Sequence, residues 1–237
     1  MRVLQMWRYP VKSMQGESPT CAEVGSRGLV GDRAAGLVDR RTGLVLTARR
    51  APAMLEATGV LRDDGPTVRL PDGTETRDEG LLSDWLGRAV TLQRAAPDLR
   101  GTYEIAADFE DESGSDWVRW EGPAGTFHDS KRTQVSVLST GSIGTWDVRR
   151  FRPNVLVDGS DEAALVGRRA DLGSACLEFV KQIDRCVIVT RPQPGGIPRQ
   201  LDVLRTINRD RGGHLGIGAM VVRPGSITVG DELGLGI

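Results

Sequence analysis

The sequence predicts a mainly β fold with a few helices, arranged as two closely packed barrel-like units, one of which is a C-terminal barrel. Short apolar segments of strand length recur along the 237 residues, and turns rich in Gly and Pro separate them. Regular alternation of strands with helices does not recur, which argues against a parallel βαβ architecture. We expect the first unit in residues 1–95, an acidic connecting segment in 96–126 and the second unit in 127–237.

The first unit is expected to contain one helix and several short strands. Its helix begins near Asp78, a residue type that caps helix N-termini, and it places Leu81, Leu82, Trp85 and Leu86 on one face. The strands are expected at residues 3–9, 20–24, 36–39, 44–47, 68–70 and 75–77.

The acidic segment between the two units shows no sustained periodicity. Its Asp and Glu residues are interspersed with Gly and Ser. A surface loop is therefore expected, and a solvated linker is favoured over a lid above a site.

The second unit is also dominated by strands. One helix fits residues 198–209, with Pro198 in its first turn and Leu201, Leu204 and Ile207 at helical spacing. Because strands far outnumber helices, a barrel-like and mostly antiparallel sheet is expected. The strands are predicted at residues 134–138, 154–157, 176–180, 186–189, 216–222 and 226–229.

Composition excludes several classes of function. The formal net charge is −1, whereas proteins that bind nucleic acid usually carry a basic excess. No apolar run approaches the roughly 20 residues that span a bilayer, and the N-terminus lacks the apolar core of a signal peptide. We therefore expect a cytoplasmic protein that binds neither nucleic acid nor membrane.

The three cysteines form no CxxC pair, so neither a zinc knuckle nor a disulfide framework is indicated. Cys21 and Cys176 lie in alternating apolar contexts and are interpreted as small buried hydrophobic residues. Cys186 follows Arg185 where an expected strand meets a loop rich in Pro and Gly. A thiolate there could bind a soft metal or carry sulfur, and a buried core thiol is an equally compatible interpretation.

Three polar residues alternate at the entry to an expected strand. Arg150, Arg152 and Asn154 would point to one face of an extended chain. Their donors indicate an anion-binding site, and surface ion pairing is the alternative.

Two further clusters have the composition of anion sites. Lys12 and Ser13 stand at the end of the first expected strand, and Arg33 follows a Gly-rich turn. Ser139 and Thr140 follow another strand, and this turn would either cradle an oxyanion or only cap a helix. There is no P-loop and no dinucleotide fingerprint, and the two histidines lack metal-ligand spacing.

Taken together and in this order, these motifs resemble the MOSC family, the molybdenum cofactor sulfurase C-terminal domain proteins, in their two-part form with an N-terminal β-barrel domain. The Arg-Phe-Arg-Pro-Asn run and the Arg-Cys pair are the specific motifs. The matching stretches are Tyr9-Pro10-Val11-Lys12-Ser13, Gly31-Asp32-Arg33, Leu46-Thr47-Ala48-Arg49, Asp147-Val148-Arg149-Arg150-Phe151-Arg152-Pro153-Asn154, Arg185-Cys186, Leu204-Arg205 and Arg223-Pro224-Gly225-Ser226-Ile227-Thr228-Val229-Gly230-Asp231.

The resemblance implies that Cys186 is both the catalytic residue and the protein ligand to the metal of a molybdenum cofactor, molybdenum bound to molybdopterin. A soft thiolate suits a metal that is already held by sulfur. The resemblance further implies a set of residues around the pterin and its phosphate: Lys12, Ser13, Arg33, Ser139, Thr140, Arg150, Arg152 and Asn154.

The best-characterised two-part relatives are the amidoxime-reducing components, which reduce small N-hydroxylated molecules and N-oxides, so the resemblance implies the same activity here. The electrons would come from a separate donor protein. The alternatives are a sulfur carrier or sulfurtransferase that uses a persulfide on Cys186, and a non-catalytic module that only binds the molybdenum cofactor.

Overall fold

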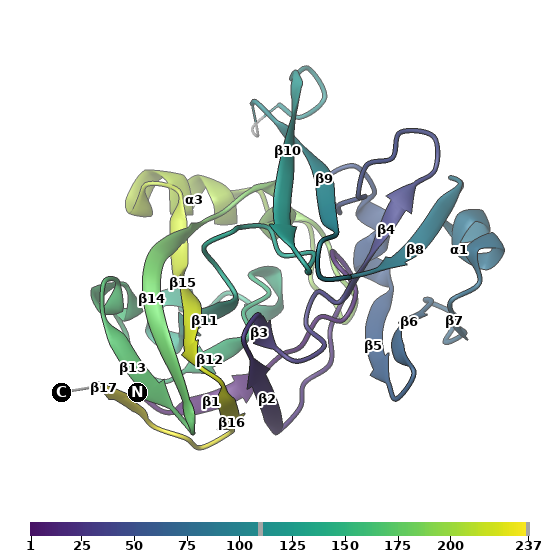
Figure 1. Ribbon diagram of the computed structural model, residues 1–237. Coiled ribbons are helices and arrows are strands. Elements are labelled where there is room, and N and C mark those ends of the chain that lie inside the picture. The colour runs from purple at the N-terminus through teal and green to yellow at the C-terminus, as the bar shows by residue number, and fades with distance from the viewer. Residues whose placement is uncertain (109–110, 236–237) are drawn as a thin grey trace.

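The computed structural model describes residues 1–108 and 111–235, and it confirms a mainly β fold. Seventeen strands, three α-helices and four short 3-10 helices are found within these residues. The C-terminal unit lies on one side of the molecule and the N-terminal unit on the other, as Figure 1 shows. No α-helix of the described chain is long and apolar enough to span a membrane.

The C-terminal unit is built around a seven-stranded, nearly closed, barrel-shaped sheet. Pairing in this sheet is antiparallel, with the exception of β11 and β12, which run parallel. Inward-facing Val, Leu, Ile and Phe side chains form its core, and burial of each contributes about 1.5–3 kcal/mol. The strand order is β1 (Val3–Met6), β12 (Val155–Val157), β11 (Val135–Ser139), β15 (His214–Arg223), β14 (Ala175–Asp184), β13 (Arg169–Leu172) and β17 (Leu233–Leu235).

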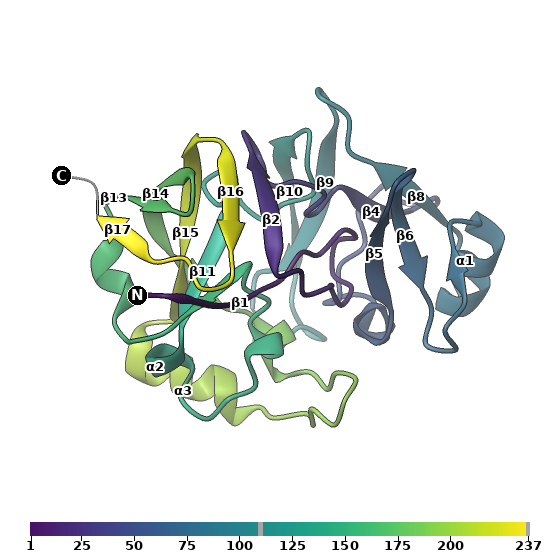
Figure 2. The same cartoon turned by 90° about the horizontal axis from the view of Figure 1, so that it is seen from below.

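Strands from the beginning of the chain complete this unit. Besides β1 in the large sheet, β2 (Cys21–Gly25) pairs with β16 (Gly225–Thr228) on one side and β3 (Gly28–Leu29) on the other, and Figure 2 shows β2 beside β16. The buried side chains of β2 and β16 belong to the same core as the barrel. The N-terminal residues therefore contribute to both units, and the expected unit limits at residues 95 and 127 stay a prediction.

The N-terminal unit contains two small antiparallel sheets and the helix α1 (Glu79–Leu86). The predicted cap of α1 is confirmed, because the Asp78 side chain accepts a hydrogen bond from the Leu81 amide. Gly87 ends the helix in the left-handed conformation. The sheets are β4 (Ala35–Asp39) with β8 (Val90–Arg94), and β5 (Thr58–Arg62), β6 (Gly65–Arg69) and β7 (Glu75–Thr76).

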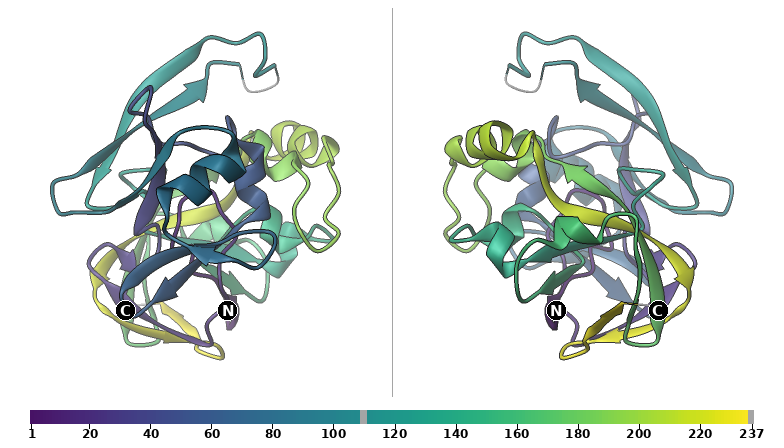
Figure 3. Two further views of the ribbon diagram at one scale, coloured as in Figure 1. Left: turned by 90° about the vertical axis from the view of Figure 1, so that its right-hand side faces the viewer. Right: turned by 90° about the vertical axis from the view of Figure 1, so that its left-hand side faces the viewer.

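The acidic segment between the units is not the surface loop that the sequence predicts. It contains a β-hairpin of β9 (Arg100–Ala106) and β10 (Trp117–Ala124), which projects from the body of the molecule (Figure 3). Tyr103 and Trp120 face each other across the two strands, and their rings stack with centroids 4.7 Å apart. This cross-strand aromatic pair stabilises the hairpin despite the acidic residues around it.

Two expected strands are absent at their predicted positions. Residues 44–47 make only an isolated bridge from Val45 to Val38. Residues 187–190 form the 3-10 helix η4 (Val187–Thr190), in which the Val189 amide donates to the Cys186 carbonyl and the Arg191 amide donates to the Ile188 carbonyl.

One of the remaining helices, η1, belongs to the N-terminal unit, and the others lie in or beside the C-terminal unit. The predicted helix near residue 200 is confirmed as α3, and it begins a few residues later than expected. The bounds are η1 (Pro52–Glu56), α2 (Thr140–Ile143), η2 (Val148–Arg150), η3 (Glu162–Leu165) and α3 (Asp202–Arg211).

Candidate functional site

A cavity of about 470 Å³ is lined by residues of both units and of the hairpin. Among its described lining residues, seven are Lys or Arg and two are Asp. Because the whole chain has a net charge of −1, positive charge is concentrated at this cavity. The charged lining residues are Lys12, Arg33, Arg49, Arg150, Arg152, Lys181 and Arg185, with Asp129 and Asp184.

Cys186 lines this cavity, and its sulfur contacts a guanidinium group from the other unit. Arg49 Nη2 donates a hydrogen bond to Cys186 Sγ at 3.3 Å. Burial opposes the charge on Arg49, but Cys186 and Asp129 raise its pKa above the ordinary value. Arg49 Nε is buried and has no hydrogen-bond partner within the described part of the chain. One strong donor beside the sulfur is thus left without an acceptor.

Lys12 is nearly fully buried and forms an ion pair at the cavity wall. Its Nζ donates to the Phe127 carbonyl at 2.9 Å and to Asp129 Oδ1 at 2.8 Å. Burial lowers the pKa of Lys12, although Asp129 opposes this shift. Burial also disfavours ionised Asp129, but Lys12 and Arg49 outweigh it and hold the pKa of this carboxyl well below its usual range. The Asp129 side chain is still 64% exposed, so its carboxylate remains accessible from the cavity.

Three cavity residues have a backbone conformation that non-glycine residues rarely adopt. Ser13, Arg33 and Arg152 have φ angles of 68°, 46° and 52°. Only one other non-glycine residue of the described chain has a positive φ. Such strain concentrates where a protein must hold functional groups in fixed positions.

Arg33 and Arg152 lie against the same aromatic ring. Their guanidinium carbons are 4.5 and 4.3 Å from the centroid of the Tyr9 ring. Asp32 accepts two hydrogen bonds from Arg33 Nη1, at 2.8 and 2.6 Å. Burial lowers the pKa of Arg152 to about 10 and raises that of Tyr9 to about 12, so both keep their usual charge at neutral pH. These two cations are positioned by cation–π contacts with Tyr9.

Arg150 also lines the cavity, but its guanidinium group is bonded to the protein. It donates to the carbonyls of Val189 and Pro198 at 3.2 and 2.8 Å, on both sides of the segment that follows Cys186. Arg150 therefore holds the shape of this segment.

Asn154 is similarly satisfied by neighbouring protein groups. Its Oδ1 accepts hydrogen bonds from the amide and the hydroxyl of Ser136, and its Nδ2 donates to Asp32 Oδ2 at 3.0 Å.

The period-two alternation expected for Arg150, Arg152 and Asn154 is wrong, because Arg150 ends a 3-10 helix and Arg152 has a left-handed backbone conformation. A turn, not an extended strand, brings the three to one cavity.

Ser139 and Thr140 are not brought to the cavity. Ser139 is fully buried, donates a hydrogen bond to Glu162 and accepts one from the Ser142 amide at the start of α2. The Thr140 hydroxyl donates to the Gly159 carbonyl at 3.3 Å. Of the two alternatives for this turn, the helix cap is therefore the one that the structure shows.

Sequence reasoning did not single out several residues of the site. Arg49 and Arg185 enter the sequence analysis only as parts of motifs, and Asp129 does not enter it. Arg185 donates to the carbonyls of Leu215 and Phe151, both at 2.8 Å, and burial lowers its pKa to about 10. Its position next to Cys186 was the available signal.

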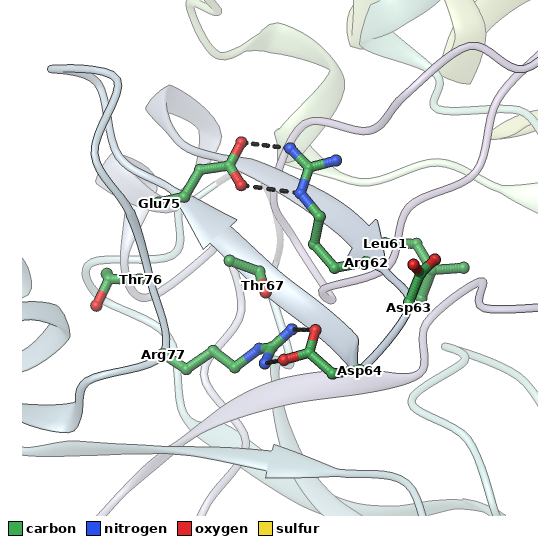
Figure 4. Close-up of a pocket in the computed structure, with 8 residues that line it drawn as sticks. All are labelled: Leu61, Arg62, Asp63, Asp64, Thr67, Glu75, Thr76 and Arg77. Carbon is green, nitrogen blue, oxygen red and sulfur yellow. Dashed lines mark hydrogen bonds and ion pairs between the residues drawn. The ribbon is translucent and has the colours of Figure 1, made fainter.

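A second hollow, of about 770 Å³, lies on the sheet β5–β6–β7 (Figure 4). Both of its guanidinium groups are already paired with carboxylates, Arg62 with Glu75 and Arg77 with Asp64. It contains none of the residues expected at the site. Nowhere in the described chain do three or more His, Cys, Asp or Glu side chains gather in a group that could hold a metal.

Comparison with known proteins identifies the two parts of the chain. The family model of the MOSC N-terminal beta barrel domain matches residues 1–112, and that of the MOSC domain matches residues 124–234. No curated protein matches significantly.

Two solved structures are similar to this chain. The YuaD protein from Bacillus subtilis is 16% identical over 98% of this chain and 93% of its own, with a TM-score of 0.47. YiiM from Geobacillus stearothermophilus is 14% identical over 57% of this chain and 72% of its own, with a TM-score of 0.38. With both domain models matched in this order, the chain belongs to the MOSC family, which is associated with molybdenum cofactor binding.

Proposed function

We propose that this chain is a molybdenum cofactor-dependent oxidoreductase that reduces small N-hydroxylated molecules or N-oxides with electrons from a separate donor protein. The observation that carries the proposal is the contact of Cys186 Sγ with Arg49 in a cavity where cations exceed carboxylates. A thiol in an ordinary apolar core would have no such partner.

The residues present fit this cofactor in three respects. Cys186 offers a soft sulfur ligand to a metal that also binds the sulfurs of the pterin. The cationic lining suits the phosphate of the pterin. Arg49 Nε, buried and without a partner in the described structure, needs an acceptor that a bound cofactor or substrate supplies.

Within this proposal the chain's residues divide into two groups. Cys186 would bind the metal, while Lys12, Ser13, Arg33 and Arg152 would surround the pterin and its phosphate. Arg150 and Asn154, whose polar groups already bond to the protein, keep the walls of the cavity in place. When bound, the cofactor supplies the two-electron chemistry that cleaves the N–O bond.

The protein contributes orientation and charge. Arg49 donates its hydrogen bond to the cysteine sulfur and fixes the direction of that ligand. Lys12 has three donors and uses two of them on Phe127 and Asp129, so one is left for a phosphate or substrate oxygen. The overall reaction consumes two electrons and two protons and releases water from the N-hydroxyl group.

The test is expression in a host that makes the cofactor, followed by measurement of molybdenum, pterin and amidoxime reduction with a chemical electron donor. We expect equimolar metal and pterin in the unmodified protein and activity that Cys186→Ala abolishes. Cys21→Ala is the matched control, because Cys21 is exposed on β2, contrary to the buried position expected for it.

Each of the other outcomes would indicate a different function for this protein. Purified protein without metal and pterin would overturn the proposal, and an added sulfur on Cys186 in the mass spectrum would then indicate a sulfur carrier. Bound cofactor without reduction of any N-hydroxylated compound would indicate a module that only binds the cofactor.

A further inference from the structure

The hairpin β9–β10 supplies two apolar residues to the cavity, whose lining also carries the cationic groups. Ile105 of β9 and Trp120 of β10 line it beside the charged residues. The hairpin is thus part of the site, in contrast to the solvated linker expected from its acidic sequence.

Trp120 is held in place by a buried tyrosine. Tyr103 is fully buried, and its ring stacks on Trp120 at a centroid distance of 4.7 Å and an interplanar angle of 24°. Gly101 and Gly122 pack directly on the tyrosine, since a Cβ on either would lie 2.7 and 2.6 Å from Tyr103 atoms. The tyrosine ring thus packs against the backbone of both strands, which restricts its movement and the orientation of the indole stacked on it.

The same tyrosine connects the apolar part of the cavity to a cation of the site. Lys12 Nζ lies 4.7 Å from the centroid of the Tyr103 ring. The series Lys12, Tyr103 and Trp120 fixes the position of the indole relative to the cationic lining.

We infer that Trp120 is a specificity-determining residue, whose indole binds the aromatic ring of the substrate and makes the enzyme prefer aromatic over aliphatic N-hydroxylated molecules. The inference rests on the proposed function and names its substrate class. An aromatic ring stacked on an indole gains both from buried area and from ring contact, and a methyl group in the same place gains little of either.

The test compares benzamidoxime with acetamidoxime, which carry the same reacting group on a phenyl ring and on a methyl group. Trp120→Leu keeps apolar volume but removes the flat surface, and we expect kcat/KM for benzamidoxime to fall about tenfold, through KM. The value for acetamidoxime should change less than about twofold. Trp120→Phe, which keeps a flat ring, should restore most of the preference.

Trp117→Leu is the matched control on the same strand. Trp117 does not line the cavity, and its ring packs under the Arg50 guanidinium at 3.4 Å. This variant should leave the ratio of the two kcat/KM values unchanged. Equal losses for both substrates in Trp120→Leu, or an unaltered preference, would overturn the inference.

Binding of benzamide and acetamide separates this inference from the proposed function, since neither amide has an N–O bond to reduce. Calorimetry should detect benzamide binding to the unmodified protein and at least tenfold weaker benzamide binding to Trp120→Leu. The affinity for acetamide should be the same in both proteins. If benzamide binds in this way but the protein reduces no amidoxime, the proposed reductase function is wrong and the aromatic binding site at Trp120 is supported. If the protein reduces amidoximes but Trp120→Leu does not change benzamide binding, the reductase function is supported and the inference about Trp120 is wrong.

Discussion

The contact between Arg49 and Cys186 joins two residues that are 137 positions apart in the chain. Cys186 stands out in the sequence through its neighbours and the order of motifs, and the structure brings it to one cavity with Lys12, Ser13, Arg33 and Arg152. The sequence does not indicate the contact of Arg49, because no local pattern shows which distant side chain lies against the sulfur. Direct neighbours of a metal ligand often decide how well the ligand is oriented.

Replacing Arg49 with Met is therefore expected to lower the affinity for the cofactor at least about tenfold, because the sulfur loses its hydrogen-bond donor. Molybdenum and pterin per chain after purification measure the effect. Arg69→Met, which breaks a surface ion pair with Glu75, should retain full occupancy. Equal occupancy in both variants would show that Arg49 does not support the ligand.

We expect His128 to make the free energy of unfolding depend on pH. Burial lowers its pKa from 6.5 to about 4, so the folded protein keeps this side chain neutral while the unfolded chain binds a proton. Its stabilising contribution is present above pH 6.5 and is lost as pH falls towards 4. The free energy of unfolding should drop by as much as about 3 kcal/mol over this window.

Denaturant titrations between pH 7 and 4 test this expectation. His128→Gln should flatten the pH dependence, because it removes the buried imidazole. A pH dependence that survives in His128→Gln would assign it to other groups.

At the scale of elements, the hairpin shows where local patterns fail. Its strands contain Gly101, Gly122 and Pro123, which are disfavoured in strands, and acidic residues surround them. The stacked pair of Tyr103 and Trp120 outweighs these preferences. By contrast, α1 was predicted from Asp78 because a helix cap is local chemistry.

Gly122→Ala tests the packing of the hairpin. Its new Cβ would lie 2.6 Å from the Tyr103 ring, and we expect a loss of about 1–3 kcal/mol in the free energy of unfolding. Gly234→Ala, where a Cβ meets no atom within 4 Å, should stay within about 0.5 kcal/mol. Denaturant unfolding measures both, and equal stability would mean that the ring has room to move.

At the scale of the whole molecule, strands from the beginning of the chain complete the C-terminal unit, and residues of both units line one cavity. A mainly β fold follows from many short apolar segments between turns, and the structure confirms it. Which strands pair does not follow, because β1 bonds to β12 and β2 to β16 across most of the chain. The sequence of a short strand does not indicate which strand, so far away in the chain, it pairs with.

Residues 127–237 expressed alone should therefore not fold cooperatively. They lack β1, β2 and β3, whose side chains complete the barrel core. Thermal unfolding followed by circular dichroism should show no sharp transition, while the full chain should show one. A sharp transition in the fragment would prove that the C-terminal unit is independent.

The pairing of β2 with β16 also sets the order of events during biosynthesis. Thr228 contacts Cys21 across 207 positions, so β2 leaves the ribosome long before its partner exists. At about 5–20 residues per second, this delay is on the order of 10–40 s. During that time the early strands need protection from wrong partners.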